Sequence, residues 1–502
     1  MSVTMGKPKL DWYTIGVALF AAIGTFLFGF DTGIATTTIA HQSWVDYMDK
    51  PSKSKVGAIV SIYIAGEAVG SILQVFAGDR LGRIRFMQIM CVIVTIGTAI
   101  QTAAANYGMF VAGRFLAGFA VGGMVGTVPV YLSEIAAPAN RGLIGGISGV
   151  GISFGSMMSN WVGFLCGLAP YGQLQWRLPL SLQIPWGIIM FIGLVTFMPD
   201  SPRQLIRAGK VDKARLEFLK IRRDLASEEN TREFAFMHAQ IEFEMARELT
   251  SYKEIFRLFK RRVLVSIAVQ TMTSLTGTNV IGYYQTILYK GLGFNPKTVL
   301  CLAGAYGTVG FVSNSLTTVF LTDAWGRRKM LITGLAGVCF WEIYSAIMLR
   351  QFNGSDNTVG KGFSIAGIYI FCVTYFGMIN STTWLYGAEV VPIILRNRVM
   401  GVASFSHFVV NVAITQAGPT AFANIHENYF YVFVGCSFFF LVMAYFFFPE
   451  TKQKSLEEIA ASFGDKVVLL TEMEVAVEAT IQQNKGGVDK LEIEDRSIDK
   501  AV

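Results

Sequence analysis

The sequence has 502 residues, of which 52% are hydrophobic and only 15% are charged. A water-soluble protein of this composition would expose large apolar patches, so we expect the chain to lie in a membrane. The net charge of +7 then reflects how Lys and Arg are distributed over membrane loops, and it gives no reason to expect a nucleic-acid partner. The 6 cysteines lie singly in or beside apolar runs, which favours packing residues over a disulfide framework.

Apolar runs of about 20 residues predict twelve transmembrane helices. The first six have the approximate limits 13–38, 56–78, 86–104, 109–132, 143–166 and 180–198. The second six have the approximate limits 263–289, 298–322, 329–349, 363–390, 399–421 and 430–448. An even number of spans places both termini on one side, and the larger share of Lys and Arg in the loops of that side predicts that it is cytosolic.

The spans divide the chain into parts with different expected roles. These are a cytosolic N-terminus at 1–12, a six-helix half at 13–198, a cytosolic helical linker domain at 199–262, a second six-helix half at 263–448, and a cytosolic, partly disordered tail at 449–502. Helical spacing of apolar residues at 211–223 and 233–249 predicts short amphipathic helices in the linker, with a passive linker as the alternative. A further helix is expected at 455–463. Asn353 stands in an N-x-S sequon on the predicted outer side and is a glycosylation candidate.

The first predicted span carries one carboxylate in its middle, Asp31, within the run Phe28-Gly29-Phe30-Asp31-Thr32-Gly33. An ionised carboxylate at membrane depth costs roughly 2.5–3.5 kcal/mol on insertion scales, so it should face a partner or a water-filled cavity. Intramembrane acids usually mark proton or substrate sites, and this is the interpretation that we favour. The alternative is a structural Asp that caps a helix break beside the two glycines.

Three short motifs occur twice, each pair separated by about half of the chain. The pairs are Gly78-Asp79-Arg80-Leu81-Gly82-Arg83 with Thr322-Asp323-Ala324-Trp325-Gly326-Arg327-Arg328, Glu134 and Arg141 with Glu389 and Arg396, and Pro199-Asp200-Ser201-Pro202-Arg203 with Pro449-Glu450-Thr451-Lys452. Because all three pairs share this offset, they favour two parallel six-helix repeats that enclose a site near the membrane midplane.

The acids and arginines of these motifs predict a cytosolic gate, whose ion pairs form when that side closes and break when it opens. The predicted gate residues are Asp79, Arg83, Glu134, Arg141, Asp323, Arg327, Glu389 and Arg396. We expect surface pairs, each worth about 0–1 kcal/mol, because a gate has to open. The alternative is that the arginines merely follow the positive-inside rule.

These motifs resemble those of the sugar porter family of the major facilitator superfamily, in particular fungal proton-coupled monosaccharide carriers. Gly113-Arg114-Phe115 and Pro129-Val130-Tyr131-Leu132-Ser133-Glu134 add to the resemblance, which runs from Trp12 to about Ala460. The resemblance implies an all-α membrane protein with twelve transmembrane helices in two pseudo-symmetric six-helix halves, a cytosolic helical linker domain, and alternating access between the two halves.

The resemblance also supplies a partner for Asp31. Family members that use protons place an Asp of the first span opposite an Arg of the fourth, which matches Asp31 and Arg114. The arginine favours the charged carboxylate while burial favours the neutral one, so the group is suited to loading and releasing a proton. Proton symport is therefore expected, with facilitated diffusion as the alternative.

The family's substrate motifs are only partly kept. The residues matched to the substrate site are Phe28, Thr273, Ser274, Asn279, Tyr283, Asn380, Trp384 and His407. Thr273 and Ser274 replace a glutamine pair, and residue counting places Gly149 and Phe311 where the family has a glutamine and an asparagine. A site that bonds a substrate hydroxyl rejects analogues without it, so these changes predict a preference for a pentose, a deoxy sugar, a polyol or a sugar acid over glucose. His407 would favour an anion if protonated and otherwise acts as a neutral partner.

The expected function is a transmembrane sugar transporter, most simply a monomer in the plasma membrane that uses protons and no metal or other cofactor. Its partners would be a sugar, protons and membrane lipid. A sugar sensor that does not transport is a weaker alternative, because the tail after Pro449 is modest. No HExxH or Walker pattern appears, so an enzyme is not expected.

Overall fold

The computed structural model describes residues 12–136, 140–222, 228–246, 252–352 and 354–452, with positions 454, 459 and 463. The chain separates into two units, one formed by Met1–Met198 with Arg261–Ile459 and the other by Pro199–Lys260 with Ala460–Val502. We call the first the helical bundle and the second the linker unit. Asn353, most of the predicted helix at 455–463 and the side chain of Arg141 lie outside the described residues.

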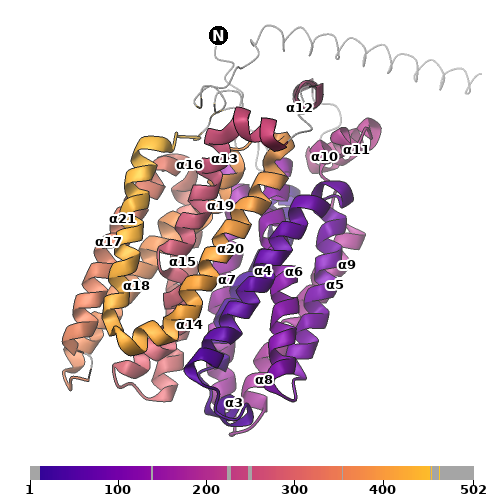
Figure 1. Cartoon of the computed structure of the whole chain (residues 1–502). Helices are drawn as coiled ribbons and strands as arrows, with labels where there is room; N and C mark the ends of the chain where they lie inside the picture. Colours follow the sequence, from indigo (N-terminus) through magenta and orange to yellow (C-terminus); the bar gives the residue numbers. More distant parts are fainter. Residues whose placement is uncertain are drawn as a thin grey trace, which may run out of the picture. The chain divides into compact units, whose positions relative to one another are not determined.

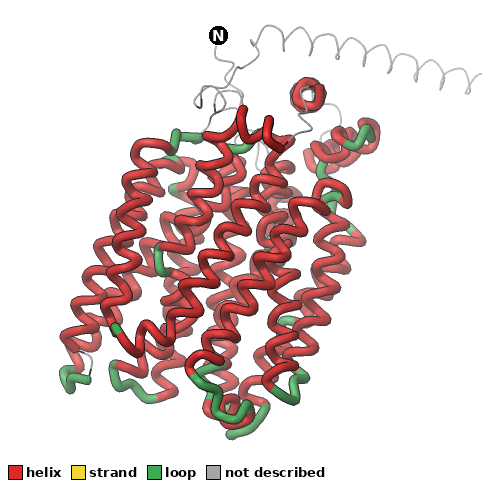
Figure 2. The backbone as a smooth tube through the Cα atoms, in the orientation of Figure 1, coloured by secondary structure: helices red, strands yellow, loops and turns green. Residues whose placement is uncertain are grey.

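The first half of the helical bundle consists of helices only (Figures 1 and 2). They are α1 (Trp12–Ala21), α2 (Ile23–Thr38), α3 (Gln42–Tyr47), α4 (Lys53–Leu81), α5 (Arg83–Thr102), α6 (Tyr107–Ile135), α7 (Arg141–Gly167), α8 (Leu174–Ser181) and α9 (Ile184–Thr196). The predicted first and sixth spans are each two consecutive helices, α1 with α2 and α8 with α9. The breaks between them lie at Ala22 and at Leu182 and Gln183.

The second half repeats this arrangement. Its elements are α13 (Tyr252–Leu275), α14 (Thr278–Gly291), α15 (Pro296–Phe320), α16 (Thr322–Trp325), α17 (Arg327–Phe352), α18 (Thr358–Thr374), the π-helix η2 (Tyr375–Asn380), α19 (Ser381–Glu389), α20 (Ile393–Asn424), the short η3 (His426–Asn428) and α21 (Tyr429–Phe447). Every element in the described residues is helical, as the sequence predicts.

The two halves pack through symmetry-related helices. Helix α4, the second span, packs along α20, the eleventh, while α7, the fifth, packs along α15, the eighth. Exchanging the halves converts one of these pairs into the other, so the internal repeat in the sequence corresponds to a repeat in packing. Helices α2 and α14 also meet between the halves.

Eleven helices among the described residues are long and apolar enough to cross a membrane. The difference from the predicted twelve lies at the seventh span, 263–289, which is divided between α13 and α14. Gly277, just before α14, has φ of +72°, a left-handed conformation that side chains other than glycine adopt only with strain. The seventh span is therefore discontinuous at a fixed point, and discontinuous helices are typical of transporter binding sites.

The linker unit has a small core of its own. It contains α10 (Pro202–Arg207), α11 (Val211–Arg222) and α12 (Glu228–Ala246), whose buried residues are Leu205, Ile206, Ala214, Phe218, Phe234, Met237 and Ile241. The Ser201 hydroxyl accepts a hydrogen bond from the Gln204 backbone N–H and so caps α10. Because these helices bury apolar residues against one another, the segment is a folded unit and not a passive connection.

We expect Gly277→Ala to destabilise the helical bundle, because the alanine would keep a left-handed conformation costing about 1–2 kcal/mol. In addition, its Cβ would lie 2.8 Å from the Phe433 ring and 2.9 Å from a Glu342 carboxylate oxygen. Thermal unfolding of the purified protein in detergent measures the effect. Gly435→Ala is the matched control, because a Cβ there meets open space. Equal melting temperatures for the two variants would contradict the expectation.

Candidate functional site

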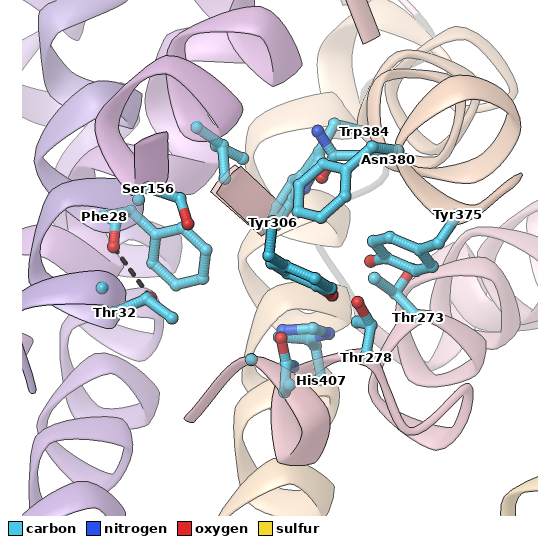
Figure 3. A pocket seen from close by; sticks show the side chains of 16 residues that line it. Phe28, Thr32, Ser156, Thr273, Thr278, Tyr306, Tyr375, Asn380, Trp384 and His407 are labelled. Atoms are coloured by element: carbon cyan, nitrogen blue, oxygen red, sulfur yellow. Dashed lines mark hydrogen bonds between the residues drawn. The ribbon is translucent and has the colours of Figure 1, made fainter. Parts of the chain in front are cut away.

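A pocket lies between the two halves of the helical bundle, and Figure 3 shows the side chains around it. The first half contributes Phe28, Gly29, Thr32, Gly33, Ile152 and Ser156. The second half contributes Thr273, Thr278, Asn279, Gly282, Tyr306, Tyr375, Phe376, Asn380, Trp384 and His407. The pocket thus takes its residues from α2 and α7 on one side, and from α13, α14, α15, η2, α19 and α20 on the other.

Aromatic rings make up much of the pocket wall: Phe28 on the first half, and Tyr306, Tyr375, Phe376 and Trp384 on the second. Rings of this kind pack against the apolar faces of a ring-shaped substrate, while a few polar groups fix its orientation. Among the described residues that line the pocket, His407 is the only one with an acidic or basic side chain. The wall is therefore suited to a neutral, partly apolar ligand.

Three polar atoms of the pocket residues are buried and have no hydrogen-bond partner in the described part of the chain. They are Asn279 Nδ2, the Tyr306 hydroxyl and His407 Nε2. An unsatisfied buried polar group costs about 1–3 kcal/mol, so each of these atoms would gain from a ligand that bonds to it. Together they offer donors and an acceptor to a hydroxylated molecule.

The surroundings of His407 determine which ring nitrogen carries the proton. Its Nδ1 lies 3.0 Å from the Gln270 backbone carbonyl and 2.8 Å from the Ser274 hydroxyl. A carbonyl oxygen can only accept, so Nδ1 carries the hydrogen and donates it. The Ser274 hydroxyl donates in turn to the His407 carbonyl at 2.7 Å. In the neutral ring Nε2 is then an acceptor on the pocket side, which suits a sugar hydroxyl better than a carboxylate.

Gly149 provides a backbone contact between the halves behind the pocket. Its carbonyl accepts hydrogen bonds from Asn314 Nδ2 at 2.9 Å and from Asn380 Nδ2 at 3.0 Å. A Cβ at this position would lie 2.3 Å from the Ser381 hydroxyl, so no longer residue fits. The chain has therefore exchanged the family's glutamine for a close approach of α7 to α19, in which a main-chain carbonyl makes the polar contacts.

Below the pocket, Asp31 and Arg114 form a fully buried ion pair. Arg114 Nη1 donates to the two Asp31 carboxylate oxygens at 2.7 and 2.9 Å, and Gln183 Nε2 donates to one of them at 2.8 Å. Thr98 and Gln101 of α5 each donate to the Gln183 amide oxygen. The structure thus brings together the two residues that the resemblance pairs, and it adds Gln183, to which no sequence motif points.

This ion pair is close to the pocket along α2. Phe28, one turn before Asp31, and Thr32, the residue directly after it, both line the pocket. The Thr32 hydroxyl lies 3.5 Å from the Tyr283 hydroxyl of α14. A change in how Asp31 is held therefore acts on a helix that contacts both the substrate site and the opposite half.

The predicted gate residues form two similar networks, one in each half, at the end of the bundle where α16 lies (Figure 1). Arg83 binds Asp79 and Glu134, each at 2.8 Å. Arg327 binds Asp323 at 3.0 Å and Glu389 at 3.1 Å. The Glu450 carboxylate accepts hydrogen bonds from the Arg327 and Arg328 backbone N–H groups and so caps α17.

The expectation of weak surface pairs is wrong for the inner members of these networks. The side chains of Arg83 and Glu134 are each 1% exposed, and those of Arg327 and Glu389 are each 3% exposed. Because each pair joins residues of the same half, it fixes helix ends within that half. Removing one partner of a buried pair typically costs about 3–5 kcal/mol.

Other residues make the contacts between the halves at this end. Arg396 donates to the Ser133 hydroxyl at 3.2 Å, and Arg398 lies 3.7 Å from Asp79. Asp323 accepts a hydrogen bond from the Leu143 backbone N–H near the start of α7, and burial raises the pKa of its carboxyl group, an effect partly offset by Arg327. The two halves are thus in contact at this end of the bundle.

The halves also meet at the opposite end, where α14 lies close to α2. The Thr36 hydroxyl donates to the Gly282 carbonyl at 2.9 Å, and Lys290 Nζ donates to the Ala40 carbonyl at 3.3 Å. Trp161 Nε1 donates to the Thr308 hydroxyl at 2.8 Å. The pocket therefore has contacts between the halves on both sides, as expected of an occluded state in an alternating-access cycle.

Of the residues predicted at the substrate, Phe28, Thr273, Asn279, Asn380, Trp384 and His407 line the pocket. Ser274 and Tyr283 do not line it, because the Ser274 hydroxyl holds His407 and Tyr283 faces Thr32. Phe311, which residue counting places at the family's asparagine, does not line the pocket and packs its ring 5.2 Å from that of Phe154.

Sequence reasoning missed most of the aromatic wall, namely Tyr306, Tyr375 and Phe376. The chain has 39 Phe and 18 Tyr residues, and nothing in the spacing of these three distinguishes them from the rings that face lipid. Asn314 was also missed. It lies three residues after Phe311 on α15, and it is the asparagine that reaches across to α7.

The fold and the pocket between its halves are those of a membrane transporter of the major facilitator superfamily. A structure of the proton:xylose symporter XylE from E. coli, bound to 6-bromo-6-deoxy-D-glucose, superposes with a TM-score of 0.79 at 20% sequence identity, covering 90% of this chain and 99% of that one. Residues 17–463 match the family described as "Sugar (and other) transporter". The chain belongs to the sugar porter family.

Curated relatives agree with this assignment. The MFS-type transporter criB of Aspergillus cristatus is 31% identical over 455 residues, which cover 90% of this chain and 93% of the relative. The low-affinity glucose transporter HXT1 of Saccharomyces cerevisiae is 31% identical over 478 residues, covering 90% and 81%. The chain is thus a multi-pass integral membrane sugar transporter, and its homologues are transporters and not enzymes.

Neutralising Arg396 should favour the conformation that is open at the gate end, because its contact with Ser133 holds the closed halves together. We expect Arg396→Gln to increase labelling of an Ile152→Cys reporter in the pocket by a thiol reagent added from the gate side. Glu389→Gln should act in the same direction by releasing Arg327.

The matched control is Glu427→Gln, which neutralises an acid at the other end of α20, near Arg350. It should leave labelling from the gate side at the level of the reporter alone. Unchanged labelling in the Arg396 variant would show that this contact does not hold the gate.

Proposed function

We propose that this sugar porter is a proton symporter for a neutral monosaccharide, with a preference for a pentose, a deoxy sugar or a polyol over glucose. The observation that carries the coupling part is the ion pair between Asp31 and Arg114, with the carboxylate 1% exposed. A carrier that moved sugar alone would have no need for an ionisable group at this depth, where charges are costly.

The coupling follows from the position of this ion pair. When the cluster gains or loses a proton, the attraction between α2 and α6 changes, and Phe28 and Thr32 move with α2 at the edge of the pocket. Binding of sugar then depends on the charge state of the cluster, and by linkage binding of the proton depends on the sugar. The fold is shared with XylE, which is named a proton:xylose symporter, and this supports the proposal.

The pocket residues support the choice of substrate. Thr273 cannot reach as far as a glutamine, and its hydroxyl donates to the Val269 carbonyl of its own helix. The Asn380 amide donates to Gly149. Fewer polar groups than usual are thus left for hydroxyls, while five aromatic rings offer apolar surface. The acceptor at His407 Nε2 favours a neutral sugar over a sugar acid, which was among the substrates expected from the sequence.

Facilitated diffusion is the second candidate, because relatives with about 30% identity are named glucose transporters. That candidate requires Asp31 and Arg114 to be structural only. The location in the plasma membrane, the cytosolic termini and the monomeric state are part of the proposal. So is the absence of any cofactor other than the proton gradient.

Asp31→Asn should abolish accumulation of sugar against its gradient and the pH dependence of uptake, while exchange of sugar across the membrane continues. The reason is that the variant lacks the charge that couples α2 to Arg114. Uptake of labelled sugar in cells without carriers of their own, compared at two external pH values, measures this. Gln42→Asn, at an exposed position of α3, is the control. Accumulation by the Asp31 variant would exclude this carboxylate from coupling.

Thr273→Gln should increase competition by glucose and weaken binding of the native substrate, because the longer amide would extend into the pocket. Each hydrogen bond gained or lost is worth about 0.5–1.5 kcal/mol. His407→Ala should weaken binding of neutral sugars by a similar amount, because it removes the acceptor.

The measurement for both variants is a panel of unlabelled sugars competing against a labelled one. Thr333→Gln, on the exposed face of α17, controls for the substitution itself. If the ranking of competing sugars is the same in all variants while expression stays normal, the assignment of selectivity to these positions is wrong.

A further inference from the structure

A second carboxylate lies beside the ion pair of Asp31 and Arg114. Glu67, in the middle of α4, has 0% exposure, and neither of its carboxylate oxygens has a hydrogen-bond partner among the described residues. Electrostatic interactions connect it to Asp31 on α2 and to Arg114 on α6. The cluster therefore contains two acids and one strong base.

The hydrogen bonds in the cluster are divided unequally between the two acids. Asp31 accepts three, two from Arg114 and one from Gln183. Donors of this kind stabilise a charged carboxylate. Glu67 accepts none from a charged or amide donor, and the hydrogen-bonding group beside it is the neutral Tyr63 hydroxyl. A buried carboxylate with so little support is strongly disfavoured in its charged form. The arrangement that leaves no uncompensated charge is ionised Asp31, ionised Arg114 and neutral Glu67.

The remaining donors of Arg114 point to what happens when Glu67 loses its proton. Arg114 Nε and Nη2 have no hydrogen-bond partner in the described chain, and the guanidinium lies 4.3 Å from the centre of the Tyr63 ring, one turn before Glu67 on α4. These unused N–H groups can stabilise a second carboxylate. Arg114 is thus placed to hold Asp31 in one state and to share its charge with Glu67 in another.

We propose that Glu67 carries the transported proton in the occluded state, while Asp31 remains ionised and paired with Arg114. This rests on the proposed symport and names the residue that binds its proton. When the gate end opens, the O–H bond of the Glu67 carboxyl breaks and the proton passes to water. The carboxylate that remains is held by the free donors of Arg114. The attraction between Arg114 and Asp31 weakens as a result, so α2 is held less tightly against α6.

The other groups that face Glu67 are consistent with this assignment. Tyr63 lies beside it on α4, and Tyr283 of α14 interacts with it across the boundary between the halves. Both are phenols that stay neutral at physiological pH. Helix α20, which also packs on α4, brings His407, whose Nδ1 is engaged by Gln270 and Ser274. Arg114 is therefore the cation available to Glu67.

Glu342 offers a matched comparison in the second half. It also has 0% exposure and two carboxylate oxygens without hydrogen-bond partners among the described residues. One of its oxygens faces Gly277 at the break before α14, and it is not among the groups that interact with Asp31 and Arg114. Each half thus contains a buried glutamate without a hydrogen-bond partner, but of these two residues only Glu67 lies beside an arginine.

The test combines infrared spectroscopy with transport. In purified protein that carries Glu342→Gln, the carbonyl stretch of a protonated buried carboxyl group should be present at neutral pH. Labelling all glutamates with carbon-13 should shift this band, and adding Glu67→Gln should remove it. Glu67→Asp, which keeps the acid, should retain a band of this kind. A band that persists in the Glu67→Gln variant, or that the labelling does not shift, overturns the proposal.

In vesicles, Glu67→Gln should lose sugar-driven proton uptake and accumulation but keep exchange of labelled sugar, which also shows that the variant folds. Glu342→Gln should keep all three. One outcome is that the unmodified protein transports no protons, but the infrared band disappears in the Glu67→Gln variant. Glu67 is then protonated as proposed, and the proposal of proton symport is wrong. If the unmodified protein moves protons and Glu67→Gln does so equally, symport stands and the role of Glu67 is refuted.

Discussion

The ion pair between Asp31 and Arg114 constrains the first half more than any other contact that we describe. Inside a membrane there is little water to solvate either charge, so each requires the other. The pair connects α2 to α6, and through Gln183 it reaches the start of α9 and the polar residues of α5. Four helices of one half are thus joined around a single carboxylate that lies one turn from the pocket.

The need of a buried charge for a partner also explains why the contacts at the two ends of the bundle differ. At the gate end, arginines and acids form buried networks within each half, while a hydrogen bond from Arg396 and the longer, more exposed ion pair of Arg398 connect the halves. At the opposite end, hydroxyl and carbonyl groups make the contacts between the halves. Strong pairs keep each half rigid, and weaker contacts between the halves can be exchanged as the carrier moves. Rigid halves with an adjustable boundary are what alternating access requires.

Much of this architecture could be predicted from the sequence because it depends on composition and repetition. Apolar length located the spans, and the common offset of the motifs indicated two halves. Asp31 stood out as a charge where charges are rare. The pocket was harder to predict, because its residues come from helices far apart in the chain. Ser274 carries the right kind of group for a sugar, and only the structure shows that His407 already occupies it. Residue counting chose Phe311 where Asn314, one turn further on, makes the contact.

The π-helix at Tyr375–Asn380 has a consequence for how this chain is compared with its relatives. A π-turn contains one residue more than an α-turn, so it amounts to a single-residue insertion accommodated within a helix. Loss of one residue from this segment would restore a regular helix and rotate α18 by about 100° relative to α19. Tyr375 and Phe376 would then leave the pocket, while Trp384 kept its place. Against a relative whose helix is regular here, an alignment without a gap would assign the wrong partners to every position on one side of the π-turn. The place of the aromatic wall therefore depends on the π-turn as much as on the residues that form the wall.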